Sequence, residues 1–386
     1  MSASARESEP TLARSRFLKG GALAVAGAGA LGAAALGAAG DAPPAGANPP
    51  VRPNPDYRRP RITRLADLTG PGITTRFRME ATDLGIPAVT PDGRLLMVFG
   101  DTFENAKVGD GWWRSPVALY AQNNRHLHHG LRWTGAVGGK SAEQLVDYAH
   151  DDDPVSTILP GDVITIGDTM YLWMMVNHGF GNVGSTEIWT STDSGETWER
   201  TAEMFDGAHL DGLSQQCTWE LNPKDDHVYL LTTGFQRDKP IILQRVPAAK
   251  ILDPAAYEIW GYAGGSWDWG NPPTKVLDGS FGEMCWRIVE GRWVFTWFNA
   301  GLYRIDCIIA DGPTADLTKA FHETLLWGCD WGHEDDERVA QLYGGYILPG
   351  STLDDLHLAV SQWHTGPDWP YHVQQFRVRG LGRALR

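Results

Sequence analysis

The hydrophobic and polar positions of this chain repeat one hairpin pattern five times. Each copy is an apolar strand, a short polar turn and a second, strongly apolar strand. The second strands are centred near residues 97, 173, 230, 295 and 359, so the pattern recurs about every 65 residues. Nothing comparable to a long amphipathic helix appears between the copies. The five hairpins are expected at Ile86–Phe99, Val163–Val176, Cys217–Thr232, Met284–Phe298 and Tyr346–Ser361.

This period predicts an all-β fold, a five-bladed β-propeller over residues 61–386. A unit of about 65 residues has room for the four strands of one blade. Radial closure of the blades hides the sheet edges that an open array of strands would expose. A pair of β-sandwiches is the alternative architecture, but it predicts no regular period.

The segment Ser191–Trp198 carries a second propeller signal. It reads Ser-Thr-Asp-Ser-Gly-Glu-Thr-Trp and matches the Asp-box pattern Ser-x-Asp-x-Gly-x-Thr-Trp, which marks a hairpin turn in propeller blades. We expect Asp193 to accept backbone N–H bonds in this turn while Trp198 packs beneath it. Asp193 is therefore predicted to be structural and not catalytic.

The amino-terminal residues read as an export signal followed by a linker. A basic element ends at Lys19 and precedes 21 uncharged residues, Gly20–Gly40, which are rich in Ala and Gly. This pattern indicates a signal peptide over residues 1–40, either twin-arginine-like or general secretory, and an uncleaved membrane anchor is the alternative. Seven prolines in residues 41–60 indicate an extended linker. We expect a secreted or cell-envelope protein without stable membrane insertion.

Composition narrows the possible partners and cofactors. The chain has 33 Lys+Arg against 47 Asp+Glu and a net charge of −14, so nucleic-acid binding is not expected. Its four cysteines are too few for a disulfide scaffold and lack zinc-site spacing, and zero, one or two disulfides are possible. No cofactor is expected. The acidic runs 151–153 and 334–337 could hold a structural calcium ion, but exposed acidic loops are commoner. His126, His128 and His129 read as a solvated loop.

Two aspartates of the first hairpin are the main candidates for catalysis. Asp83 and Asp101 are symmetric about Asp92, at the middle of the turn. They are directly opposite each other if the loop has three residues and diagonal neighbours if it has two, so their Cβ atoms lie roughly 5–8 Å apart. Repulsion between close carboxylates keeps one protonated beside an ionised one, as glycoside hydrolysis requires. The alternative is that both aspartates are turn residues that bond their own backbone.

Other candidates lie where strands begin or end at the end of the propeller that carries Asp83 and Asp101. Glu283 enters the fourth inner strand and is the reserve catalytic acid. Trp112 and Trp113 could stack on a sugar and Arg114 could bind its hydroxyl groups, although loop packing explains the tryptophans equally well. The remaining candidates for substrate binding are His178, Glu220 and Trp363. We expect Asp83 and Asp101 to line the largest pocket.

Several of these segments together resemble a known family. Ala81–Ile86, Phe99–Phe103, Gly111–Ser115, Gly282-Glu283, Tyr343–Tyr346 and Ser361–Trp363 look like the family catalogued as domain of unknown function 4185. Members have been assigned as endo-D-arabinanases of glycoside hydrolase family 183, which have a five-bladed propeller fold. They cleave the α-linked D-arabinofuranose backbone of mycobacterial arabinogalactan and lipoarabinomannan. The resemblance implies that Asp83 and Asp101 are the catalytic carboxylates and that D-arabinan is the substrate.

Two hypotheses about function follow. The first is a secreted glycosidase that cleaves D-arabinan with the Asp83 and Asp101 pair. The second is a non-catalytic carbohydrate-binding propeller at the cell envelope that uses aromatic residues alone. An enzyme needs acids that converge on one pocket, whereas a lectin needs only aromatic and amide side chains.

Overall fold

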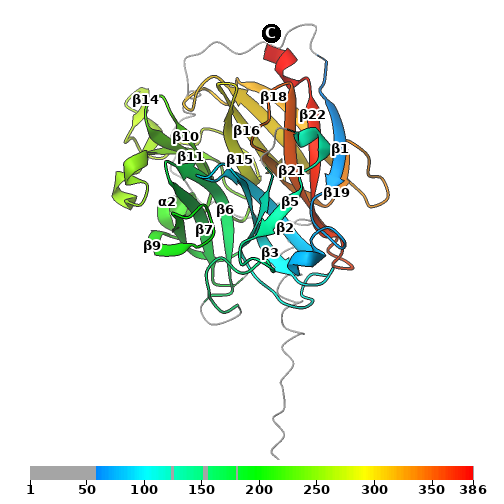
Figure 1. The fold of residues 1–386 in the computed structure, drawn as a ribbon. Helices are drawn as coiled ribbons and strands as arrows, with labels where there is room; N and C mark the ends of the chain where they lie inside the picture. Colours follow the sequence, from blue (N-terminus) through cyan, green and yellow to red (C-terminus); the bar gives the residue numbers. More distant parts are fainter. Residues whose placement is uncertain (1–57, 123–125, 151–154, 180, 386) are drawn as a thin grey trace, which may run out of the picture.

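The computed structural model describes residues 58–385 apart from 123–125, 151–154 and 180. Within this part of the chain, five sheets are arranged around a centre as the blades of a propeller (Figure 1), and their strands pair antiparallel except for the parallel pair β18–β19. The prediction of an all-β five-bladed β-propeller is confirmed. The predicted signal peptide and the linker up to residue 57 lie outside the described residues. No described helix is long and apolar enough to cross a membrane.

Each blade keeps its strands in chain order from the centre outwards, except where the ring closes. Blade 1 contains β2 (Ala81–Val89), β3 (Leu95–Phe103), β4 (Val117–Ala121) and β5 (Trp133–Ala136). Blade 2 contains β6 (Thr157–Ile166), β7 (Thr169–Asn177), β8 (Val183–Ser191) and β9 (Glu199–Asp206). Blade 3 contains β10 (Gln216–Asn222), β11 (His227–Thr233), β12 (Ile242–Pro247), β13 (Glu258–Ala263) and β14 (Ser266–Trp269). Blade 4 contains β15 (Phe281–Val289), β16 (Arg292–Asn299), β17 (Arg304–Ala310), β18 (Phe321–Cys329) and β19 (Arg338–Ala340).

Blade 5 closes the ring with a strand from the other end of the chain. It contains β20 (Leu342–Ile347), β21 (Asp355–Trp363), β22 (Tyr371–Arg379) and, as its outer strand, β1 (Arg61–Asp67). β1 pairs antiparallel with β22, and the blue strand lies beside the red one in Figure 1. The hairpin repeats do not predict β1, because this strand belongs to no repeat of its own.

Helical segments are short and lie in the connections. They are η2 (Thr75–Phe77), η3 (Leu127–His129), α2 (His209–Gly212), η4 (Ala248–Lys250), η5 (Pro254–Ala256) and η6 (Leu381–Leu385). The apolar core lies within and between the blades, where it includes the edge-to-face pair Trp173–Trp219 at 5.7 Å between blades 2 and 3. Burial of such large aromatic side chains dominates the energy of a β-core.

A buried ion pair ties blade 2 to blade 4 near the propeller axis. The Arg287 guanidinium donates to both carboxylate oxygens of Asp162, at 2.5 and 2.8 Å. Asp162 also accepts hydrogen bonds from Thr218 Oγ1 at 2.7 Å and from the backbone N–H of Trp219 at 3.1 Å, both in blade 3. Both oxygens of the buried carboxylate are satisfied, so the pair links the inner strands β6 and β15 without an unpaired charge.

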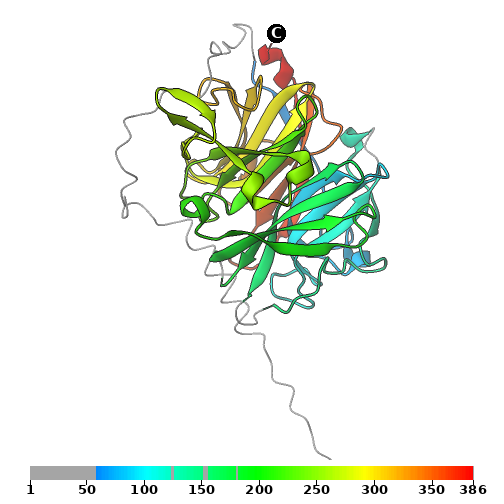
Figure 2. The same ribbon diagram turned by 90° about the vertical axis from the view of Figure 1, so that its left-hand side faces the viewer.

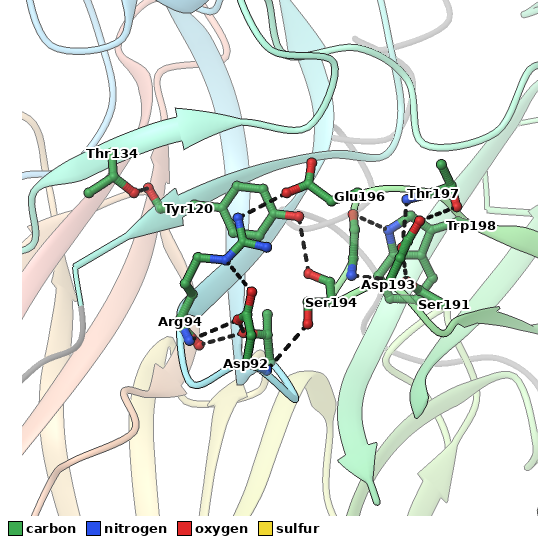
Figure 3. Close-up of polar contacts among 12 residues, drawn as sticks. Asp92, Arg94, Tyr120, Thr134, Ser191, Asp193, Ser194, Glu196, Thr197 and Trp198 are labelled. Carbon is green, nitrogen blue, oxygen red and sulfur yellow. Dashed lines mark hydrogen bonds and ion pairs between the residues drawn. The ribbon is translucent and has the colours of Figure 1, made fainter. Parts of the chain in front are cut away.

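The Asp box has the predicted structural role. Asp193 accepts hydrogen bonds from the Thr197 N–H at 2.9 Å and from the Thr197 hydroxyl at 2.6 Å, and Trp198 is buried beneath the turn (Figure 3). The turn also docks onto blade 1, since Arg94 bonds Glu196 at 2.9 Å and the Tyr120 hydroxyl bonds the Ser194 carbonyl at 3.1 Å. The box therefore fixes the contact between two blades.

The four cysteines form no disulfide. Cys217, Cys285 and Cys307 are buried free thiols, and Cys329 is a partly exposed one. Burial raises the pKa of the Cys285 thiol to about 12. Of the possibilities left open by the sequence, the structure has zero disulfides.

Candidate active site

The β2–β3 hairpin brings the two candidate aspartates close enough for the charge of Asp101 to act on Asp83. Val89 pairs with Leu95 and the Thr90 N–H donates to the Arg94 carbonyl, so the loop has three residues centred on Asp92. Thr82 pairs with Thr102 at the other end. The loop therefore has the predicted three residues, but the register shifts between Thr82 and Leu84, so Asp83 lies opposite the Gly100–Asp101 step and not in a regular pair with Asp101.

The backbone beside Asp83 is strained. Leu84 has φ 68°, a left-handed conformation that is costly for a branched side chain, and Gly85 follows at φ 82°. The Leu84 N–H donates to Ser361 Oγ of blade 5 at 2.8 Å, which holds this conformation. A Cβ atom at Gly100 would lie 2.5 Å from Asp83 Oδ1, so only glycine allows the carboxylate this position.

Asp83 is half-buried, and its carboxyl group lies in surroundings that favour its protonated form. Oδ2 accepts a hydrogen bond from the Tyr343 hydroxyl at 3.0 Å, whereas Oδ1 is buried without a partner among the described residues. The pKa of Asp83 is raised well above its usual value, chiefly by burial and then by the negative charge of Asp101. Hydrogen bonds from Tyr371 and Tyr343 act in the opposite direction and lower this pKa.

Asp101 is held by donors from two blades. Its Oδ1 accepts a hydrogen bond from Trp113 Nε1 at 2.8 Å in blade 1 and a longer one from Thr157 Oγ1 at 3.4 Å in blade 2. Trp113 packs at 4.1 Å from the His150 ring, so the donor has little freedom to turn away. Asp101 is 5% exposed. These donors stabilise a negative charge on Asp101 and fix the orientation of its carboxylate.

Glu283 adds a third acid from blade 4. Its Oε1 accepts a hydrogen bond from Arg237 at 2.6 Å, and its Oε2 is buried without a partner among the described residues. The charge of Glu283 contributes to raising the pKa of Asp83, so the two carboxylates interact. The three acids therefore gather at one end of the propeller, where the inner strands β2 and β15 begin.

Two of the predicted binding residues also lie at this site. Trp113 bonds Asp101, as described above. The Trp363 ring lies 5.4 Å from that of Tyr371, and Trp363 Nε1 is buried without a partner among the described residues. Trp112 is half-buried and packs against the guanidinium groups of Arg114 at 4.1 Å and Arg78 at 5.1 Å.

Three other residues predicted to bind substrate make their described contacts away from the carboxylates. Arg114 is 1% exposed and donates to the backbone carbonyls of its own loop and of Ala142, and burial lowers its pKa to about 10. Glu220 lies further along its strand beside Arg287 at 3.9 Å, and burial raises its pKa to about 7. His178 is exposed in the loop after β7 and covers Gly184.

Sequence reasoning missed the residues that other blades contribute. Tyr343 and Tyr371 of blade 5 bond Asp83, Arg237 of blade 3 bonds Glu283, and Thr157 of blade 2 bonds Asp101. Tyr343 lies within a motif of the family resemblance, which is the one signal that could have singled it out. A contact between blades otherwise leaves no local trace in the sequence.

The site does not coincide with the cavity found at the edge of the propeller. That cavity, of about 660 Å³, lies between blades 4 and 5 and is lined by residues such as Arg64, Asp336 and Gln374. Neither Asp83 nor Asp101 lines it, so it does not support the prediction that the pair lines the largest pocket. No group of three or more His, Cys, Asp or Glu side chains in the described part of the chain could hold a metal ion, and the acidic run 151–153 lies outside that part.

Known proteins resemble this chain in sequence and in fold. A protein of Mycolicibacterium smegmatis named "Uncharacterized 35.9 kDa protein in asd 3'region" is 31% identical over 83% of this chain and 99% of its own length. "Notoamide biosynthesis cluster protein J'" of Aspergillus versicolor is 30% identical over 76% of this chain and 83% of its own length.

A candidate hydrolase from Bacteroides ovatus has a solved structure that matches with a TM-score of 0.58. The match is 12% identical and covers 85% of this chain and 93% of the other. At that identity the likeness supports the fold alone. The model of the family described as domain of unknown function DUF4185 matches residues 69–377. Since this match spans most of the propeller, the chain belongs to the DUF4185 family.

Proposed function

We propose that this protein is a glycoside hydrolase that cleaves α-linked D-arabinofuranosyl bonds in D-arabinan. The observation that carries the proposal is the neighbouring pair Asp83 and Asp101, of which Asp83 has a raised pKa and Asp101 accepts hydrogen bonds from Trp113 and Thr157. Glycoside hydrolysis uses such a pair. The family resemblance supports D-arabinan as the substrate, and a relative from a mycobacterium fits a polymer of mycobacterial cell walls.

The surroundings of the two groups suggest their roles. Asp83 is the general acid, since burial and the neighbouring negative charges favour its protonated form, and it gives its proton to the leaving glycosidic oxygen. Asp101 is the carboxylate that either attacks the anomeric carbon or takes a proton from the attacking water. The N–H of Trp113 and the hydroxyl of Thr157 donate to Asp101 and align its carboxylate for that step.

Glu283 and Trp363 complete the proposed substrate site. Glu283 has one oxygen on Arg237 and a second oxygen without a partner among the described residues, which suits the acceptance of a sugar hydroxyl. The Trp363 ring offers a surface for stacking next to the tyrosines that hold Asp83. The Asp box lies on a different hairpin and takes no part in the reaction.

An export signal in residues 1–40 would take the protein to its substrate. The basic element before Gly20–Gly40 and the prolines that follow support a secreted or cell-envelope location. Detection of the mature amino terminus by mass spectrometry of culture fluid and envelope fractions tests this part of the proposal.

A non-catalytic carbohydrate-binding propeller is the second candidate function. One observation favours it: Asp101 is nearly buried, whereas Trp112 and Trp363 are partly exposed. In that case the aspartates would stabilise the strand ends and the aromatic residues would bind the sugar.

Hydrolysis of purified arabinogalactan separates the two candidates. The parent protein, Asp83→Asn and Asp101→Asn are incubated with the polymer, and released oligosaccharides are separated and counted. We expect release by the parent and a loss of at least about 10²-fold in each variant, the lower range for removal of one acid–base group. Asp268→Asn, at an exposed position of β14, is the matched control and should cleave like the parent. Binding of the polymer without release of oligosaccharides by the parent would favour the lectin instead.

A further inference from the structure

A second aromatic group lies at the corner between blades 4 and 5, at the same end of the propeller as the acids. Trp331 follows β18 in blade 4, and His364 follows β21 in blade 5. Their rings are stacked, with centroids 4.1 Å apart and an interplanar angle of 10°. Both side chains are partly exposed. The stack therefore presents a flat surface built by two blades.

Hydrogen bonds hold this stack in place. Trp331 Nε1 donates to Gln341 Oε1 at 3.3 Å, and the Thr365 N–H donates to the same oxygen at 3.0 Å. Gln341 Nε2 donates to Thr365 Oγ1 at 3.0 Å. Gln341 lies between β19 and β20, where blade 4 passes into blade 5. A platform fixed in this way loses little conformational entropy when a ligand binds.

Polar atoms beside the stack lack partners. Trp363 Nε1 and His364 Nδ1 are buried and make no hydrogen bond among the described residues. An unpaired buried polar atom is costly and needs an explanation, and a ligand that reaches it on binding is one such explanation. A flat aromatic surface beside unpaired nitrogen atoms suits a sugar, which has an apolar face and hydroxyl groups at its edge.

The stack is continuous with the candidate active site. Tyr371, which bonds Asp83, pairs across the strands with Trp363, and their rings are 5.4 Å apart. His364 is the next residue after Trp363, and its ring stacks on that of Trp331. The aromatic surface therefore continues from Trp363 to Trp331. A chain of sugar units that starts at the acids can therefore extend over Trp363 to the stack.

The charge of the neighbouring loop limits the kind of polymer. Glu334, Asp335 and Asp336 are exposed in the same loop as Trp331. They repel an anionic polysaccharide at close range, whereas a neutral chain is not affected.

We propose that Trp331 and His364 form a distal subsite for a neutral polysaccharide chain, beyond the Trp363 surface that lies next to the acids. This inference rests on the proposed function, since it assumes that Asp83 and Asp101 mark the cleavage point. The subsite adds binding energy only for a chain long enough to reach it, so it makes cleavage dependent on chain length.

The test compares long and short substrates in a variant of the stack. kcat/KM is measured for purified D-arabinan and for its shortest cleavable fragment with the parent and with Trp331→Ala. We expect a loss of about tenfold on the polymer, which equals about 1.4 kcal/mol, and less than twofold on the fragment. Trp267→Ala is the matched control, because Trp267 is also half-buried and stacked, at 6.1 Å from Trp260. Its hairpin, β13–β14, projects from the far edge of blade 3 (Figure 2).

Each outcome decides a separate question. Equal losses on polymer and fragment, no loss on either, or the same loss in Trp267→Ala would overturn the distal subsite. If the parent cleaves no arabinan, the proposed function fails. The subsite is then tested by the retention of the protein on immobilised neutral polysaccharides, namely D-arabinan, xylan and galactan. Weaker retention of Trp331→Ala than of the parent would support it, and equal or absent retention would overturn it.

Discussion

Replacing Tyr343 by phenylalanine removes the hydroxyl that donates to Asp83 Oδ2 at 3.0 Å and leaves the ring in place. A hydrogen bond to the charged form of a carboxyl group lowers its pKa, so the loss of this bond raises the pKa of Asp83 further. If Asp83 is the general acid, a higher pKa keeps it protonated to higher pH. We therefore expect the alkaline limb of the pH profile of kcat/KM to move upwards in Tyr343→Phe.

The size of this shift follows from the strength of the bond. A hydrogen bond to a charged group contributes about 1.5–3 kcal/mol, and one pKa unit corresponds to about 1.36 kcal/mol. Loss of the bond would raise the pKa of Asp83 by about 1–2 units. Tyr371 also bonds Asp83 and compensates in part, so we expect a shift of about one unit.

The assay is the pH dependence of kcat/KM on D-arabinan for the parent, Tyr343→Phe and a matched control. Tyr229→Phe is that control, because the Tyr229 hydroxyl also donates to an aspartate, Asp225 Oδ2, at 2.8 Å in blade 3. It should leave both limbs of the profile unchanged. An unmoved alkaline limb in Tyr343→Phe would refute the reasoning, and movement of the acidic limb instead would make Asp83 the base.

Three further predictions concern stability. Folding raises the pKa of Asp83, so its contribution to stability is fully present below the unfolded pKa of about 3.9 and is lost as pH rises through the folded pKa. Asp83→Asn should therefore melt about 2 °C above the parent at pH 7 and no higher than the parent at pH 3.5, as thermal melts would show. Arg287→Met leaves the buried Asp162 charge without its partner and should lower the free energy of unfolding by about 3–5 kcal/mol in urea titrations. A loss below about 1 kcal/mol would contradict the stabilising role of this pair. Asp193→Ala should lower the free energy of unfolding by about 1–3 kcal/mol in the same titrations and leave the kcat of the folded protein unchanged. A large fall in kcat would contradict the structural role of Asp193.

The sequence by itself determined the blades and the position of the two aspartates. Hairpins are local, so their apolar strands and polar turns can be recognised within about 20 residues, and five such hairpins predict five blades. The symmetry of Asp83 and Asp101 about Asp92 predicted a direct pair, because the register of a hairpin follows from its turn. The turn has three residues as that pair requires, but the register shifts between Thr82 and Leu84 and places Asp83 opposite Gly100 and Asp101. The Asp box was equally local, and its predicted bonds are confirmed.

Only the tertiary structure decided what surrounds those aspartates. The closure of the ring by β1 and β22 joins Arg61 to Arg379, and the bond between Tyr343 and Asp83 joins two blades at opposite ends of the chain. Such pairings depend on how complete blades pack, and no spacing along the chain encodes them. Arg114 shows the same limit, since its sequence neighbours indicate an available cation whereas packing buries it against backbone carbonyls. Protonation and access at this site depend on burial and on charges from other blades, and these arise only when the ring has closed.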